Sequence, residues 1–111
     1  MKELRLSDLS AARQAFIRRC QRLGFGKIVA LAVRDCEPVF DEHTEVFVDL
    51  KLDVGEAPRY EQDLSDFVLS TELELLFSTL DAICNGTIEQ VEVRTGVPRR
   101  MVFRAADSMH V

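Results

Sequence analysis

The segment over residues 86–103 constrains the fold of this chain most, because it reads as a β-hairpin. Apolar and polar residues alternate up to Val93, a Thr95-Gly96 pair follows, and a second β-rich segment begins at Val97. Glycine supplies the positive φ that a tight turn needs, so a Thr-Gly pair between two β-rich segments predicts a hairpin.

A similar pattern occurs 60 positions earlier, without a gap. The matched pairs are Gly26 and Gly86, Ile28 and Ile88, Leu31 and Val91, Val33 and Val93, Arg34 and Arg94, and Pro38 and Pro98. The match extends backwards through one amphipathic helix in each half. Self-similarity at a fixed offset is typical of a duplicated supersecondary unit. Unrelated helix-glycine-strand units also look alike, because both periodicities are common, so duplication and coincidence remain alternatives.

The length of 111 residues predicts a single domain over residues 1–111. We divide it into a first repeat over about residues 10–53, a connection over 54–69 and a second repeat over about 70–105. Each repeat is predicted to be a helix followed by two strands. Two such α-β-β repeats give an α+β fold, with one antiparallel sheet of four or five strands and both helices packed on one face.

Both helices are predicted from apolar residues that recur on one face at the helical period. Ser10 is expected to cap the first helix, which ends at Leu23. Ser70 or Thr71 is expected to open the second helix, where Thr71 and Glu74 fit a capping box.

Two segments of the first repeat are predicted to be strands. Residues 27–34 are apolar almost throughout, which places this strand centrally with both faces covered. Residues 44–53 alternate most regularly, with Val46, Val48, Leu50 and Leu52 on one face. Phe47 falls on the opposite, charged face. It is expected either to lie partly covered under a loop or to contact a second chain.

Both hairpins begin with an irregular apolar spacing. Ile28 and Leu31 are three positions apart rather than two, and the equivalent pair in the second repeat has the same spacing. A β-bulge, which adds one residue to a strand, would restore the alternation. It would also aim Arg34 and Arg94 to the same side of the sheet.

Charge is distributed unevenly along the chain. Residues 1–34 carry a net charge of +6, residues 35–92 carry -14 and residues 93–111 carry +3, which together give -5. Eight arginines of the first helix and the last hairpin could form a basic face that contacts phosphates: Arg13, Arg18, Arg19, Arg22, Arg94, Arg99, Arg100 and Arg104. The acidic middle of the chain and the lack of a nucleic-acid-binding signature favour ion pairing within or between subunits instead.

The sequence predicts no catalytic residue, metal site or cofactor. Cys20, Cys36 and Cys84 are odd in number and widely spaced, which is typical of neither a disulfide framework nor a zinc site. Cys20 and Cys84 are expected on apolar helix faces, and Cys36 in the first hairpin turn. His43 and His110 lie in polar segments without an orienting partner, so both are expected at the surface.

The favoured function is a non-catalytic module that forms a homodimer and binds a protein partner, since an exposed strand edge or sheet face would then be covered. One alternative is a nucleic-acid-binding accessory protein that uses the arginine-rich face. Another is a small-molecule binder or enzyme with its site between the repeats, holding Arg34 or Arg94 together with Tyr60, the only tyrosine.

The chain contains no apolar segment long enough to span a bilayer, and its first residues lack the apolar core of a signal peptide. We therefore expect a cytoplasmic protein without a membrane partner.

Overall fold

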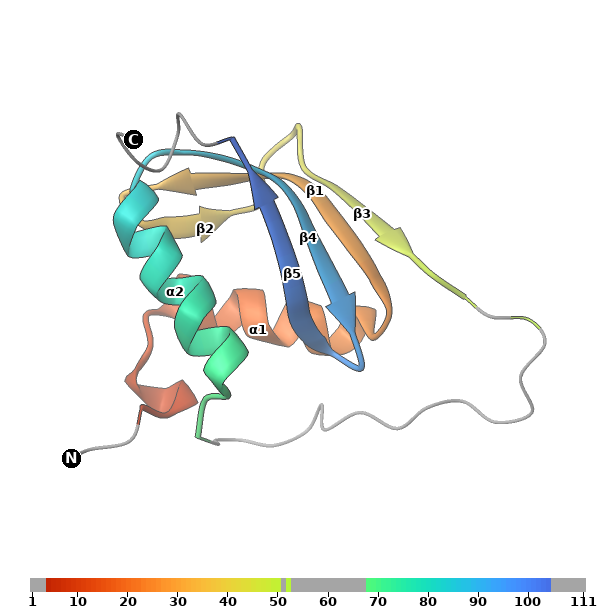
Figure 1. Cartoon of the computed structure of the whole chain (residues 1–111), viewed down its shortest axis with the longest axis horizontal. Coiled ribbons are helices and arrows are strands. Elements are labelled where there is room, and N and C mark those ends of the chain that lie inside the picture. Colours follow the sequence, from red (N-terminus) through yellow and green to blue (C-terminus); the bar gives the residue numbers. More distant parts are fainter. Residues whose placement is uncertain (1–3, 51, 53–67, 105–111) are drawn as a thin grey trace.

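A computed structural model of the chain describes residues 4–50, 52 and 68–104. It confirms the α+β class, with two α-helices and a five-stranded antiparallel sheet (Figure 1). A 3-10 turn over Leu6–Asp8 comes first. The elements that follow are α1 (Ala11–Leu23), β1 (Gly26–Arg34), β2 (Glu37–Val39), β3 (Glu45–Val48), α2 (Thr71–Ile83), β4 (Gly86–Arg94) and β5 (Val97–Phe103).

The sheet is built around the antiparallel pair β1 and β4. Its order is β2-β1-β4-β5, and β3 also pairs with β1. β2 pairs with the carboxyl half of β1 and β3 with the amino half, so the two short strands follow one another along the same edge. β5 forms the opposite edge beside β4. The first strand is therefore central, as predicted.

Side-chain caps fix the start of each helix. The Ser10 hydroxyl accepts a hydrogen bond from the Arg13 amide at 3.2 Å, and the Ser70 hydroxyl accepts one from the Leu73 amide at 3.3 Å. Ser70 is the cap, and the capping box expected from Thr71 is wrong because Thr71 is already the first helical residue. Neither α-helix in the described part of the chain is long and apolar enough to cross a bilayer.

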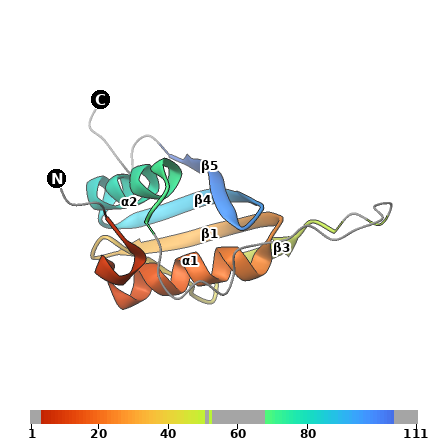
Figure 2. The ribbon, with the colours of Figure 1, turned by 90° about the horizontal axis from the view of Figure 1, so that it is seen from below.

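Both helices pack on one face of the sheet, which bends around them (Figures 1 and 2). The rings of Phe16 in α1 and Phe77 in α2 meet edge to face, with centroids 6.3 Å apart. The buried strand residues beneath them are Ile28, Leu31, Val33, Ile88, Val91 and Val93. The other face of β1 is only partly covered: Ala32 is buried, Val29 is half-buried and Lys27 is exposed. The expectation that both faces are covered is therefore wrong for the amino half of this strand.

Equivalent elements of the two halves start 60 positions apart, as Ala11 and Thr71 do, and Gly26 and Gly86. The β1–β4 ladder pairs Gly26 with Val93 and Val33 with Gly86, which is the register of a two-fold arrangement. Two units of the same order can also arise independently, so the duplication itself stays a prediction.

Both strands are irregular at the positions where the apolar residues are three rather than two apart. Ala30 has a φ of 60° and is absent from the otherwise regular β1–β4 ladder. In β4, the pairing with β5 shifts between Ile88 and Gln90, which leaves Glu89 as the extra residue. An extra residue bends a strand and increases its twist, and both β1 and β4 curve strongly in Figure 1.

β3 is shorter than predicted. The strand covers Glu45–Val48 instead of residues 44–53, and only Val46 of the four alternating apolar residues packs against the core. The alternation is real, but β1 begins at Gly26, which pairs with Val48. Beyond that pair, the sheet offers β3 no further strand partner.

Candidate functional site

Apolar side chains are exposed on β3 and immediately after it. Phe47 is 45% exposed, Val48 68%, Leu50 73% and Leu52 88%. We call residues 45–50 and 52 the β3 arm. In Figure 1 the arm leads away from the body of the molecule. A contiguous exposed apolar segment is typical of an interaction surface, whereas isolated exposed apolar residues are ordinary.

The backbone of the β3 arm is paired on one side only. Its other side faces no strand among the described residues, so a row of amide and carbonyl groups is open there. Pairing with the body ends at the Asp49 amide, which donates to the Phe25 carbonyl at 2.8 Å. An open edge of this kind can accept another strand by backbone hydrogen bonding.

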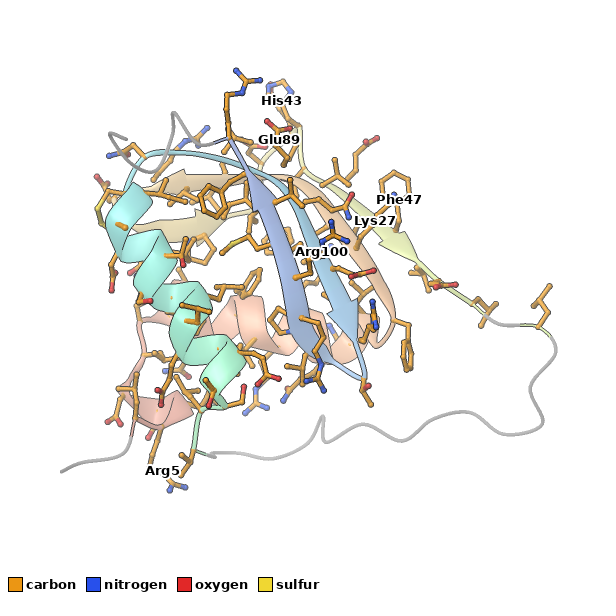
Figure 3. All side chains as sticks on the ribbon, in the orientation of Figure 1. Arg5, Lys27, His43, Phe47, Glu89 and Arg100 are labelled. Atoms are coloured by element: carbon orange, nitrogen blue, oxygen red, sulfur yellow. A yellow bond between two sulfur atoms is a disulfide. The ribbon has the colours of Figure 1, made fainter. Side chains whose placement is uncertain are left out.

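Gly26 allows the arm to approach β1 closely. A Cβ atom there would collide with the Phe47 carbonyl oxygen and would lie 3.0 Å from a Leu23 methyl carbon. The Lys27 ammonium lies 5.4 Å from the centre of the Phe47 ring, a cation–π contact on the sheet face away from the helices (Figure 3). The ring is 45% exposed, and Lys27 of β1 links it to the body.

A second surface feature is a shallow depression at the β4–β5 turn, with a volume of about 540 Å³. Its lining residues are Glu92, Arg94, Thr95, Arg99 and Arg100. We call it the arginine depression. Its three guanidinium groups against one carboxylate favour an anion.

Two of these arginines are already paired. Arg94 lies 3.3 Å from Glu92, and Arg99 lies 2.6 Å from Glu72. The pKa of Glu72 is held below its ordinary value, first by its own backbone N–H and further by the charge of Arg99. Arg100 has no ion-pair partner within the described residues, so it is the guanidinium most available to a ligand.

The residues predicted for a site between the repeats do not all converge. Arg34 and Arg94 end β1 and β4, which are antiparallel, so they lie at opposite ends of the sheet. Arg34 pairs with Asp41 at 3.2 Å, whereas Arg94 lines the arginine depression. Both follow a buried valine and therefore share the outer face, but the bulges do not bring them together. Tyr60 lies outside the described residues.

The predicted arginine-rich face is only partly assembled. Arg18 donates to the Gln21 side chain at 2.9 Å, and Arg22 is exposed in the last turn of α1. The Gly96 amide donates to the Gly24 carbonyl at 2.8 Å, which brings this end of α1 to the β4–β5 turn. Arg22 thus lies at the same end of the molecule as the arginine depression, while Arg104 follows the far end of β5 and lies 3.9 Å from Glu89.

Sequence reasoning missed a disulfide between Cys36 and Cys84. Cys84 follows α2 as its C-cap rather than lying on the apolar face of the helix, which corrects that expectation. The Cys36 amide donates to the Cys84 carbonyl at 2.8 Å, and Gly96 and Gly24, each 60 positions from one of these cysteines, make the same hydrogen bond. Cys36 and Cys84 thus stand where the matching positions of the other half hold Gly96 and Gly24. Comparing the two halves of the sequence could have shown that the two cysteines are neighbours.

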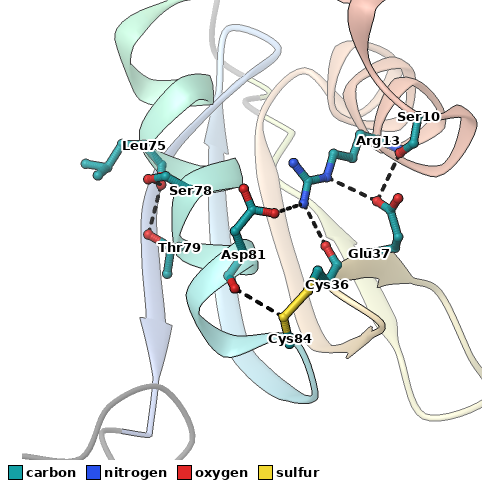
Figure 4. A network of polar contacts seen from close by, with 9 residues as sticks. All are labelled: Ser10, Arg13, Cys36, Glu37, Leu75, Ser78, Thr79, Asp81 and Cys84. Carbon is teal, nitrogen blue, oxygen red and sulfur yellow. Dashed lines mark hydrogen bonds and ion pairs between the residues drawn. A yellow bond between two sulfur atoms is a disulfide. The ribbon is translucent and has the colours of Figure 1, made fainter.

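Arg13 joins three elements beside this disulfide (Figure 4). Its guanidinium donates to the Glu37 carboxylate at 3.1 Å, the Cys36 carbonyl at 2.8 Å and the Asp81 carboxylate at 2.5 Å. It also lies 5.1 Å from the centre of the Phe77 ring. Its side chain is only 14% exposed, so Arg13 is a structural link rather than part of a basic face.

The described histidine, His43, lies in an exposed polar turn beside acidic residues. His43 is largely exposed, its ring lies 3.6 Å from the Glu42 carboxylate, and its amide donates to Asp41 at 2.9 Å. His110 lies outside the described residues. The pKa of Asp41 is lowered, first by the His43 amide and further by the Thr44 hydroxyl and the charges of His43 and Arg34. No group of three potential ligand residues is close enough among the described residues to hold a metal ion.

Comparisons with protein-family models, with curated proteins and with solved structures found no match to this chain. A function must therefore be argued from the two surface features and the charges around them.

Proposed function

We propose that this protein is a non-catalytic association module that binds a second polypeptide through the β3 arm. The proposal rests on the exposure of Val48, Leu50 and Leu52 directly beside an open strand edge. An incoming strand would satisfy the open backbone groups and cover these side chains together. Full burial of one such side chain contributes about 1.5–3 kcal/mol.

We propose a second copy of the chain as the first partner, which makes a homodimer the smallest assembly. The outer sheet face supports this because it is not wholly polar. Val29 is half-buried there and Val102 is 39% exposed, beside the charged Glu92 and Arg100. A further protein partner could use the same arm, because backbone pairing places few demands on sequence.

Sedimentation velocity of the purified chain tests this proposal. Changing Val48 and Leu50 together to serine should remove the assembled species, because both side chains lose the apolar surface that a partner would cover. Leu75→Ser is the matched control, since Leu75 is 66% exposed on α2 and lies outside the arm. If the arm variant and the Leu75 control assemble like the wild-type chain, the arm is not the interface.

The arginine depression favours a second candidate function, the binding of a phosphate-bearing ligand such as a single-stranded nucleic acid. Arg100, with no ion-pair partner among the described residues, is the residue that supports it. Calorimetric titration with an oligonucleotide at two salt concentrations tests it, since phosphate contacts weaken steeply with salt. Arg100→Gln should weaken binding, while Arg34→Gln at the opposite end should not. Absence of binding by the wild-type chain at low salt would rule the candidate out.

We retain the cytoplasm as the proposed location, although the cysteines no longer support it, because two of them form a disulfide. Cytosolic thiols are kept reduced, so Cys36 and Cys84 would be free thiols there. Alkylation in intact cells followed by mass measurement of the chain decides the question. Alkylation of both Cys36 and Cys84 supports the cytoplasm, and a chain in which these two cysteines are unmodified contradicts it.

A further inference from the structure

We infer that the β3 arm of one copy pairs with β5 of the next copy, so that the chain assembles edge to edge through two different strands. This inference rests on the proposed association function. It adds which strand of the second copy pairs with the arm, in which direction that strand runs and in which register it pairs.

The two edges of the sheet carry opposite charge. Residues 35–50, which contain β2 and β3, hold six acidic residues and no lysine or arginine. Residues 97–104, which contain β5, hold three arginines and no acidic residue. The two segments form opposite edges of one sheet. Complementary charge steers two surfaces together and selects against wrong pairings.

The strand directions suit this contact. β3 is antiparallel to β1, β1 to β4, and β4 to β5, so β3 and β5 run in opposite directions within one molecule. A second copy placed beside β3 in the same orientation therefore presents its β5 antiparallel. The sheet would continue from copy to copy without a change in pairing type.

The side-chain pattern fixes a register. Alternate residues of a strand share a face, so Glu45, Phe47 and Asp49 form one row on the arm. Arg100 and Val102 of β5, together with Arg104 directly after it, form the corresponding row. Lys27 and Glu92, the ladder partners of Phe47 and Arg100, place both rows on the face away from the helices.

Pairing Phe47 with Val102 in antiparallel register sets Glu45 opposite Arg104 and Asp49 opposite Arg100. An apolar pair then lies between two ion pairs, and opposite charges directly across a ladder are favourable. Glu45, Asp49 and Arg100 have no ion-pair partner among the described residues, and Arg104 reaches Glu89 only at 3.9 Å. Few existing contacts would have to be given up.

Pairing between identical edges is disfavoured by the same pattern. Two β3 arms centred on Phe47 would set Glu45 against Asp49 twice. Two β5 strands centred on Val102 would set Arg100 against Arg104 twice. Like charges directly opposite destabilise a strand pair. A contact between two different edges generates a closed ring or an open chain of copies.

Charge reversal tests the register with chains that differ only at its four charged positions. Glu45→Arg with Asp49→Arg makes both edges basic, and Arg100→Glu with Arg104→Glu makes both acidic. Each double variant alone should lose assembly, with the dissociation constant raised about 100-fold or more by like-charge contacts. An equimolar mixture of the two should assemble again, and native mass spectrometry should find both chains in one complex. The chain carrying all four reversals should assemble by itself.

Arg99→Glu is the matched control, because Arg99 lies on β5 but outside the proposed row and pairs with Glu72. It should change assembly far less than the Arg100 and Arg104 reversals. Circular dichroism of each variant checks that the fold is retained.

Two results overturn the inference in distinguishable ways. If the Val48 and Leu50 serine variant dissociates but the charge reversals assemble like the wild-type chain, the arm is an interface and β5 is not its partner. A wild-type chain that stays monomeric across a concentration series, at low and at high salt, refutes the inference and the proposed self-association together.

Discussion

Breaking the Cys36–Cys84 disulfide tests the least expected contact of this fold. The bond joins the β1–β2 turn to the end of α2 across a sequence separation of 48 residues. In the chain-entropy description, closing a loop of that length restricts the unfolded state by about 4 kcal/mol. We expect Cys36→Ser with Cys84→Ser to lower the free energy of unfolding by this amount.

A matched variant separates the covalent bond from the backbone around it. Cys36 has a φ of 66° and Cys84 a φ of 58°. Positive φ values of this kind are disfavoured for every residue that carries a Cβ atom, and glycine adopts them readily. The equivalent residues at the other end are Gly96 and Gly24, with φ of 77° and 76°. Replacing both cysteines by glycine should therefore cost less than replacing both by serine, by roughly 1 kcal/mol in total.

Urea unfolding followed by circular dichroism measures both differences, with and without a thiol reductant. The wild-type chain should unfold at a lower urea concentration under reducing conditions, whereas both variants should be indifferent to the reductant. Equal midpoints for the oxidised and reduced wild-type chain would refute the disulfide reasoning. Equal stability of the glycine and serine variants would refute the backbone argument.

Three further changes have defined expectations. Arg13→Ala should lower the free energy of unfolding by roughly 1.5–3 kcal/mol, because it removes the charged hydrogen bonds of a side chain that is only 14% exposed; the exposed Arg22→Ala serves as control in the same urea assay. Gly26→Ala should release β3 from β1, because the added carbon collides with the β3 backbone. The release should appear as faster exchange of the Asp49 amide, which donates to the Phe25 carbonyl; unchanged exchange would contradict this. The lowered pKa of Asp41 contributes stability above its unfolded value of 3.8 that is lost as pH falls through the folded pKa. Asp41→Asn should remove that part of the acid dependence, and an unaltered pH profile would contradict it.

Cys20 gives an independent check on the core. Burial raises the pKa of its thiol to about 12, so the reactive thiolate is scarce at neutral pH. An alkylating reagent should leave Cys20 unmodified in the folded chain and label it only in denaturant. Rapid labelling without denaturant would show that the space around this side chain is open.

The sequence alone determined the features that depend on neighbouring residues. Helix starts at Ser10 and Ser70 follow from hydroxyl groups that pair with amides three residues later. The Thr95-Gly96 turn and the irregular backbone at Ala30 follow from backbone preference and from the spacing of apolar residues. The α+β class followed as well, because two helix-hairpin units leave few ways to bury their apolar faces.

Only the tertiary structure decided the features that depend on how distant segments meet. Antiparallel pairing of β1 with β4 separates Arg34 from Arg94, although their sequence positions are equivalent. Two cysteines 48 positions apart become partners because that same pairing sets the end of α2 against the first hairpin turn. The alternation after Glu45 predicted one long strand with an apolar face, yet the pairing of β3 with β1 ends at Gly26 and Val48 and leaves the rest of that face open. Periodicity records which residues share a face, but what covers the face is set by register and strand length, which are long-range properties.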